Sequence, residues 1–238
     1  MLEIIAHRGF SAIAPENTIA AFAAALASGA SSVEFDLQLS AEGIPVIFHD
    51  RNLERITGIS GIINEKSLDE IEQLDAGKWF DEKFAGEKIP TLAEALKILK
   101  SVDKFLYFDI KPYHNWTDLS LEMLVELLIK EEVLEKCIIT SFDETFLQRC
   151  HYLFSQIKLG YFLVSDSDFL QQIKKAKAAE NAVLSTYYKV LFADPLIVER
   201  TRDQGIDLVV WTVDDREDFE KLVKMGVKRI ITNSIIES

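Results

Sequence analysis

Cysteine is scarce in this chain of 238 residues, and that scarcity excludes two classes of small protein. The two cysteines, Cys137 and Cys150, form no Cys-x-x-Cys motif, so neither a disulfide framework nor a zinc finger fits. Both are expected to be buried apolar side chains. A reduced, cytoplasmic location is therefore the expectation.

Long apolar runs and an excess of positive charge are missing as well. No stretch approaches the roughly 18 apolar residues of a membrane span, and Met1-Leu2-Glu3 does not resemble the start of a signal peptide. Lysine and arginine number 26 against 39 aspartates and glutamates, a formal net charge of −13. This charge argues against nucleic acid partners and against stable membrane association. At first sight, this charge also disfavours the binding of an anionic substrate.

What is present is an ordinary globular composition, with 48% hydrophobic and 27% charged residues. Short apolar runs alternate with amphipathic helical stretches, and most of these runs are continuous, as in strands buried on both faces. The candidate strands are residues 2–6, 33–39, 44–48, 105–110, 137–140, 158–163, 183–187, 207–213 and 229–232. This alternation predicts right-handed crossovers and a parallel sheet, so the expected fold is α/β, a TIM (β/α)8 barrel.

Capping residues mark where several helices should begin and end. An alanine-rich helix over 20–28 is expected to stop at Gly29. Capping patterns predict further helix starts at Ser67–Glu70, Thr91–Glu94, Ser141–Glu144 and Asp215.

Two segments depart from the alternation. Only Ser40 to Gly43 separates the runs 33–39 and 44–48, which is too short for a parallel crossover, so these runs predict an irregular hairpin in the barrel wall. The long segment 51–89 is rich in aromatic residues and is expected to be a small inserted cap over one mouth of the barrel. No linker separates it from the rest, so residues 1–238 are expected to form a single domain.

Ionisable side chains occur at the predicted C-terminal ends of the strands, where TIM barrels carry their active sites. Charged groups in strand interiors conflict with core packing unless they are paired or bind a metal. The candidates at these ends are His7, Arg8, Glu34, Asp36, His49, Asp109, Lys111 and Trp211.

Glu34 and Asp36 stand two residues apart on one strand, so both side chains point to the same face. Two carboxylates placed so closely repel each other unless a cation lies between them. Oxygen ligands suit a hard divalent cation, calcium or magnesium, and Asp109 is a natural third ligand.

The predicted hairpin brings His49 to the same face. Turns of two or four residues centred within 40–43 pair Glu34 with His49, and a turn shifted by one residue towards Gly43 pairs Asp36 with His49. In either register, His49 shares a face with both carboxylates.

Taken singly, each candidate has a more ordinary interpretation. His7 alone fits a structural histidine, Asp109 and Lys111 fit an ion pair, and Trp211 fits a core residue. His114 and His151 are interpreted as peripheral. The joint occurrence of so many ionisable groups at strand ends favours an active site.

The order of these motifs resembles the glycerophosphodiester phosphodiesterase family over nearly the whole chain. The matching segments are Ala6-His7-Arg8-Gly9, Ala14-Pro15-Glu16-Asn17-Thr18, Val33-Glu34-Phe35-Asp36, Phe48-His49-Asp50, Asn52-Leu53-Glu54-Arg55, Ile89-Pro90-Thr91-Leu92, the stretch ending at Lys111, and Trp211-Thr212-Val213. The resemblance implies hydrolysis of glycerophosphodiesters, such as glycerophosphocholine or glycerophosphoethanolamine, to sn-glycerol 3-phosphate and an alcohol. It also suggests a path through a 1,2-cyclic phosphate.

The resemblance also implies a role for each candidate residue. Implied roles are metal ligation by Glu34, Asp36 and Asp109, acid–base catalysis by His7 and His49, and substrate or phosphate binding by Arg8, Lys111 and Trp211. Two positions depart from the family pattern, because Asp109 replaces a glutamate and Asn233 replaces an aspartate. The expected partner is a small-molecule substrate, bound by a monomer or homodimer.

Other functions are compatible with the same features. Related barrels act as lysophospholipase D-like phosphodiesterases, and an apolar surface for an acyl chain would mark that function. A Schiff-base aldolase would use Lys111, although the pair of Glu34 and Asp36 argues against it. A barrel that only binds a ligand would tolerate substitution at His7 and His49.

Overall fold

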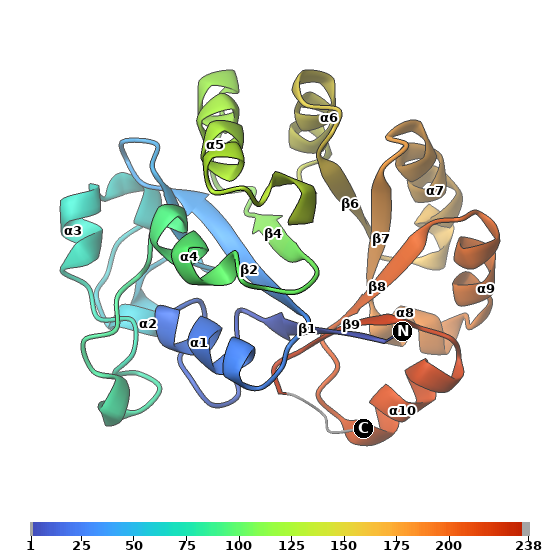
Figure 1. Ribbon diagram of the computed structural model, residues 1–238, viewed down its shortest axis with the longest axis horizontal. Coiled ribbons are helices and arrows are strands. Elements are labelled where there is room, and N and C mark those ends of the chain that lie inside the picture. The colour runs from blue at the N-terminus through green and yellow to red at the C-terminus, as the bar shows by residue number, and fades with distance from the viewer. Residues whose placement is uncertain (1, 235–238) are drawn as a thin grey trace.

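The computed structural model describes residues 2–234 and confirms the predicted barrel (Figure 1). Among these residues, nine strands form one sheet in the order β1-β9-β8-β7-β6-β5-β4-β2-β3, and a further pairing of β1 with β2 closes all but β3 into a parallel ring. The ring strands are β1 (Glu3–His7), β2 (Ser32–Leu39), β4 (Leu106–Ile110), β5 (Cys137–Ser141), β6 (Lys158–Leu163), β7 (Ala182–Tyr187), β8 (Asp207–Trp211) and β9 (Arg229–Thr232). Their bounds lie close to the predicted runs.

Helices connect successive strands and surround the ring (Figure 1). The main connecting helices are α1 (Ile19–Ala27), α4 (Leu92–Leu99), α5 (Asp118–Lys130), α6 (Glu144–Leu153), α7 (Phe169–Ala178), α8 (Tyr188–Ala193), α9 (Leu196–Asp203) and α10 (Arg216–Lys224). Short 3-10 turns, η3 (Leu134–Lys136) and η4 (Asp166–Asp168), precede β5 and α7. Within residues 2–234, no helix has both the length and the apolar character that crossing a bilayer requires.

The strands are buried on both faces, which explains their continuous apolar sequences. Phe35 and Phe108 point outward and belong to the core between ring and helices, with their ring centroids 4.6 Å apart. Tyr107, Ile138 and Val183 point inward and fill the barrel. Side chains on one face of each strand therefore pack against the helices, and those on the other face fill the barrel, with the ones near the C-terminal ends at its mouth.

The predicted hairpin exists, but both predicted registers are wrong. Strand β3 (Pro45–Ile47) pairs antiparallel with β2 through Gln38 and Val46, outside the ring. Continued, this register would set His49 opposite Phe35, on the face away from the carboxylates. Strand β3 instead ends at Ile47, and the buried Gln38 Nε2 donates to the carbonyl oxygens of Phe48 (2.7 Å) and Asp50 (2.8 Å). These bonds hold the chain on both sides of His49 as it leaves the ladder.

The segment 51–89 is an ordered excursion at the left of Figure 1. It contains α2 (Glu54–Thr57), η1 (Ile63–Glu65), α3 (Leu68–Glu72) and η2 (Glu82–Phe84). Its apolar side chains pack with those of β3 and the residues that follow β3, in a cluster separate from the main core. This cluster comprises Val46, Phe48, Leu53, Ile56, Ile63, Ile71, Ala76 and Ile89.

Most predicted helix ends are confirmed. Capping boxes form at Ser67 and Thr91, Asp215 caps α10, and Gly29 adopts a left-handed φ of +77° after α1. The predicted start at Ser141 is wrong, because that residue completes β5 and Asp143 caps α6 instead. Both cysteines are buried, as expected.

Candidate active site

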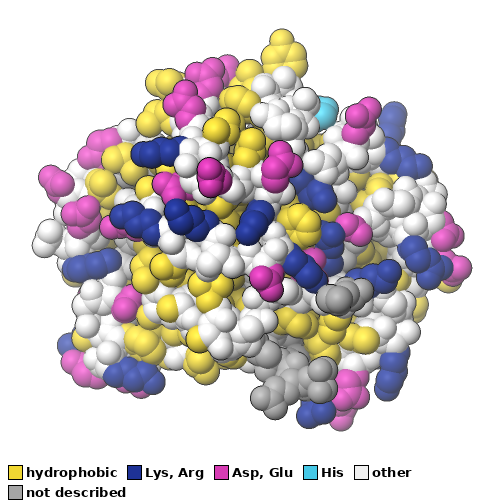
Figure 2. Space-filling model, viewed as in Figure 1, with side chains coloured by type: hydrophobic (Ala, Val, Ile, Leu, Met, Phe, Trp, Pro, Cys, Tyr) yellow, Lys and Arg dark blue, Asp and Glu magenta, His cyan; other side chains and the backbone are white. Residues whose placement is uncertain are grey.

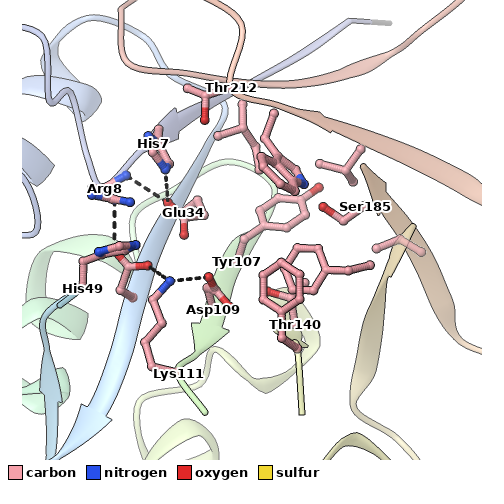
Figure 3. Close-up of a pocket in the computed structure, with 17 residues that line it drawn as sticks. His7, Arg8, Glu34, His49, Tyr107, Asp109, Lys111, Thr140, Ser185 and Thr212 are labelled. Atoms are coloured by element: carbon pink, nitrogen blue, oxygen red, sulfur yellow. Dashed lines mark hydrogen bonds and ion pairs between the residues drawn. The ribbon is translucent and has the colours of Figure 1, made fainter. Parts of the chain in front are cut away.

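A cavity of about 200 Å³ opens at the C-terminal ends of the strands (Figure 3). The eight residues singled out from the sequence all line it, namely His7, Arg8, Glu34, Asp36, His49, Asp109, Lys111 and Trp211. In Figure 3 the charged side chains and the histidines occupy one side of the cavity, and Tyr107, Thr140 and Ser185 lie on the other.

The turn after β1 gives His7 and Arg8 their positions. Arg8 and Gly9 both have left-handed backbones, with φ of +54° and +78°. A Cβ atom on Gly9 would lie 2.6 Å from the backbone carbon of Ala21 in α1, so only glycine fits. The sharp turn lets the Arg8 N–H donate to Glu34 Oε2 at 3.0 Å.

Three carboxylates, two from within β2 and one from the end of β4, form an acidic cluster. Oxygen atoms of Glu34, Asp36 and Asp109 lie within 4.8 Å of one another. Burial and the neighbouring charges of Asp36 and Asp109 raise the pKa of Glu34 well above its usual value. Asp109 Oδ1 is buried and has no hydrogen-bond partner in the described part of the chain. An unpartnered oxygen beside two further carboxylates fits a hard cation.

The positively charged side chains of Lys111 and Arg8 neutralise part of this acidic cluster. Lys111 Nζ lies 2.6 Å from Asp36 Oδ1 and 2.6 Å from Asp109 Oδ2, and Arg8 Nε lies 3.1 Å from Asp36 Oδ2. Burial would raise the pKa of Asp36, but Lys111 and Arg8 hold it far below its usual value. Asp36 is therefore ionised, and both cations stand where they can also face a phosphate.

Each histidine is oriented through its Nδ1 atom. His7 Nδ1 lies 2.6 Å from Asn233 Oδ1, and His49 Nδ1 lies 2.6 Å from Asp50 Oδ1. Burial and the neighbouring Arg8 lower the pKa of His7 to about 4. A neutral His7 can accept a proton near neutral pH.

Four further residues support the site, and sequence reasoning did not assign them roles. Asn17 Nδ2 donates to Asp36 Oδ2 at 2.7 Å, and Glu16 accepts from Arg8 Nη1 at 2.8 Å. Arg55, in α2, donates to both Glu16 and Asp50, and Gln38 holds the chain around His49. Glu16, Asn17 and Arg55 lie in motifs that carried the family resemblance, which was the one available signal.

Aromatic side chains form the opposite wall of the cavity. The rings of Phe142 and Phe162 stack at 4.0 Å, and Trp211 meets Phe162 edge-on at 6.0 Å. Trp211 Nε1 is buried without a hydrogen-bond partner within residues 2–234. The cavity thus pairs a charged side with an apolar side.

Comparison with known families decides the identity of the chain. The Glycerophosphoryl diester phosphodiesterase family matches residues 7–237, which include all eight candidate residues. The chain belongs to this family. As a glycerophosphodiester phosphodiesterase, it is a phosphoric diester hydrolase.

Individual relatives of this phosphodiesterase agree with the assignment. A glycerophosphodiester phosphodiesterase of Caldanaerobacter subterraneus is 36% identical over 97% of this chain and 93% of its own length. A phosphodiesterase of Oleispira antarctica, solved in complex with the product sn-glycerol-3-phosphate, has a TM-score of 0.89 at 31% identity, covering 97% of this chain and 92% of its own. A glycerophosphodiester phosphodiesterase of Agrobacterium tumefaciens has a TM-score of 0.81 at 26% identity, covering 98% and 97%.

Proposed function

We propose that the protein hydrolyses glycerophosphodiesters to sn-glycerol 3-phosphate and an alcohol, with a divalent cation and histidine acid–base catalysis. The observation that carries this proposal is the cavity itself, which is lined by two histidines, three carboxylates and two basic side chains. The product bound in the Oleispira antarctica relative supports the choice of substrate. The segment 51–89 is proposed to serve as a cap within one domain, and the expected setting is the cytoplasm.

Glu34, Asp36 and Asp109 would hold calcium or magnesium. The unpartnered Asp109 Oδ1 and the raised pKa of Glu34 are both features that a bound divalent cation would satisfy. A bound divalent cation supplies charge neutralisation and acidifies a coordinated hydroxyl. Asp109 is one methylene shorter than the family's usual glutamate, so a bound ion would lie closer to β4 or would reach Asp109 through a bridging water.

The two histidines would transfer the protons. One removes the proton from the glycerol 2-hydroxyl, whose oxygen attacks phosphorus, and the other protonates the departing alcohol. Water then opens the resulting 1,2-cyclic phosphate with the two roles exchanged. Arg8 can hold two phosphate oxygens with its guanidinium group, Lys111 adds a point charge, and the Trp211 ring lines the cavity where the substrate would bind.

A metal-supplemented assay over a panel of glycerophosphodiesters, with detection of glycerol 3-phosphate, tests this function. His7→Ala and His49→Ala are each expected to reduce turnover roughly 10²–10⁴-fold without unfolding the protein. His151→Ala, on α6, is the matched control and is expected to keep full turnover. Near-normal turnover in both active-site variants would contradict the assignment.

One observation favours a second substrate class. Phe142, which lines the cavity, exposes 52% of its surface. Tyr187, which packs against Trp211, exposes 39%, and Val164, which lines a second hollow together with Tyr187, exposes 58%. Such a surface could receive the acyl chain of a lysophospholipid, as in a lysophospholipase D-like phosphodiesterase. Adding lysophospholipids to the same panel separates the two candidates, because only the second would release a lysophosphatidate.

A further inference from the structure

Two residues orient the His7 ring, Asn233 directly after β9 and Asp214 in the loop after β8. We propose that Asp214 and Asn233 are positioning residues that hold His7 in the tautomer with its proton on Nδ1, which leaves the Nε2 lone pair for the reaction. The catalytic consequence rests on the proposed function, but the tautomer itself does not.

Asn233 contacts His7 through its amide oxygen. Strands β1 and β9 are neighbours in the ring, so Asn233, directly after β9, lies beside the end of β1. Its Oδ1 is 2.6 Å from His7 Nδ1, while His7 Nε2 is 3.9 Å from Glu34 Oε2. An amide oxygen only accepts hydrogen bonds, so His7 Nδ1 must carry the proton if that oxygen faces it.

Asp214 determines which end of the amide faces His7. Asn233 Nδ2 donates to Asp214 Oδ2 at 2.6 Å, and the Asn233 backbone N–H donates to Asp214 Oδ1 at 2.7 Å. On the other side, Ser11 Oγ donates to Asn233 Oδ1 at 2.8 Å. Rotating the amide by half a turn would set its oxygen against the Asp214 carboxylate. The amide therefore has one favourable orientation.

Further hydrogen bonds keep this arrangement rigid. Thr232 Oγ1 also donates to Asp214 Oδ1 at 3.0 Å, and the Ala12 N–H donates to the Asn233 carbonyl at 2.9 Å. Three donors thus converge on the Asp214 carboxylate, which does not itself touch His7. Asp214 acts through Asn233, much as hydrogen-bonded outer groups orient histidine ligands in metal sites.

The departure from the family pattern gains a meaning here. Asparagine at position 233 orients the ring by hydrogen bonding, as an aspartate would, but adds no negative charge beside it. Because an amide has a donor end and an acceptor end, it needs a second group to select its orientation. Asp214 is that group.

Nitrogen-15 NMR of the full chain labelled at histidine tests the inference without substrate. In the wild type, the neutral His7 ring is expected to show a protonated Nδ1 and an unprotonated Nε2, with His7→Gln identifying its signals. In Asp214→Asn, the new side chain would place an N–H group opposite Asn233 Nδ2. The Asn233 amide is then expected to rotate and to present its N–H group to His7 Nδ1. The His7 proton is therefore expected on Nε2. The expected kcat falls roughly 10- to 100-fold, with KM nearly unchanged.

Asp215→Asn is the matched control, because it removes the same charge one residue away. Asp215 caps α10 by accepting from the Asp218 N–H, and asparagine caps helices equally well. This variant is expected to keep the wild-type tautomer and kcat.

A wild-type His7 protonated on Nε2, or a ring unchanged by Asp214→Asn, would overturn the inference. If Asp214→Asn does not fold, Asn233→Ala provides the second test. Without an acceptor at Nδ1, His7 is then expected to populate both tautomers, and a persistent single Nδ1–H form would contradict the inference. If His7 shows the expected tautomers but the protein releases no glycerol 3-phosphate, the proposed function is wrong and the inference about the tautomer still stands.

Discussion

At the scale of single residues, Arg55 links the segment 51–89 to the catalytic side of the cavity. Its Nη1 and Nη2 donate to Glu16 at 2.9 and 2.7 Å, and its Nε donates to Asp50 at 2.6 Å. Asp50 in turn contacts His49, and Glu16 contacts Arg8. One planar guanidinium thereby fixes the partners of two active-site residues.

This geometry predicts that lysine cannot replace Arg55. Both Arg55→Lys and Arg55→Ala are expected to lower kcat roughly 10- to 100-fold, because a single ammonium group cannot reproduce the fork. Steady-state kinetics on a glycerophosphodiester checks this. Arg216→Lys, in an exposed pair with Glu220, is the control with no expected change. Full activity in Arg55→Lys would show that charge alone suffices.

Sequence reasoning identified residues by chemical type and position, and so it found the candidates that line the cavity. A carboxylate or histidine at a strand end stands out against an apolar background. Gln38 and Asp214 do not stand out, because their importance depends on partners that only the folded chain brings near. Gln38 donates to two backbone carbonyls, and backbone partners leave no trace in the side-chain pattern.

At the scale of elements, the close packing of β1 against α1 depends on Gly9. Gly9 and Gly29 have nearly the same backbone, with φ of +78° and +77°, but a Cβ atom would clash with Ala21 only at Gly9. Gly29→Ala is expected to cost about 1 kcal/mol of unfolding free energy, from backbone strain alone. Gly9→Ala adds the clash and is expected to cost at least about 2 kcal/mol more.

Urea unfolding of the two glycine variants measures this difference. Turnover of Gly9→Ala should also fall, because the same turn carries His7 and Arg8. Equal losses of unfolding free energy would show that the clash relaxes freely.

A second element-scale contact joins η1 to the loop after β4. Asn64 Nδ2 lies 2.5 Å from His114 Nδ1, and burial together with Arg51 lowers the pKa of His114 to about 4. Between about pH 6.5 and pH 4 the unfolded chain therefore binds more protons at this residue than the folded chain does. The stability that neutral His114 contributes is complete above about pH 6.5 and is lost as the pH falls towards 4.

His114→Gln should accordingly lose less unfolding free energy than the wild type when the pH drops from 7.5 to 5. Urea titrations at both values check this. Parallel losses in the two proteins would show that His114 does not contribute to acid sensitivity.

The elements themselves were largely predictable, but their fine register was not. Strands buried on both faces leave continuous apolar runs, and the ring order follows from the right-handed crossover rule. The pairing between β2 and β3 ends at Ile47, where the hydrogen bonds from the Gln38 side chain hold the chain that follows. A side-chain bond of this kind cannot be predicted from the apolar pattern. Ser141 does not cap a helix because it pairs with Ile110 in the ladder between β4 and β5.

At the scale of the whole molecule, the net charge of −13 does not determine the charge that a substrate meets in the cavity. Acidic and basic side chains are interspersed on the face shown in Figure 2. Inside the cavity, Glu34, Asp36 and Asp109 face Arg8 and Lys111. With a divalent cation added, the local charge turns favourable for phosphate.

Chelation should therefore weaken substrate binding as well as turnover. Isothermal titration with glycerol 3-phosphate is expected to show binding in magnesium or calcium and at least a roughly tenfold weaker affinity after treatment with a chelator. Glu34→Ala should behave like the chelated wild type under both conditions. Unchanged affinity in the presence of the chelator would contradict the metal assignment.

Closure of the ring through β1 and β9 also sets the timing of activity during synthesis. His7 leaves the ribosome before its partner Asn233, which follows 226 positions later in the chain. Contacts so distant in sequence form late in folding. A nascent chain that still lacks β9 has no Asn233 beside His7, so under the proposed mechanism unfinished copies of the enzyme are expected to be inactive.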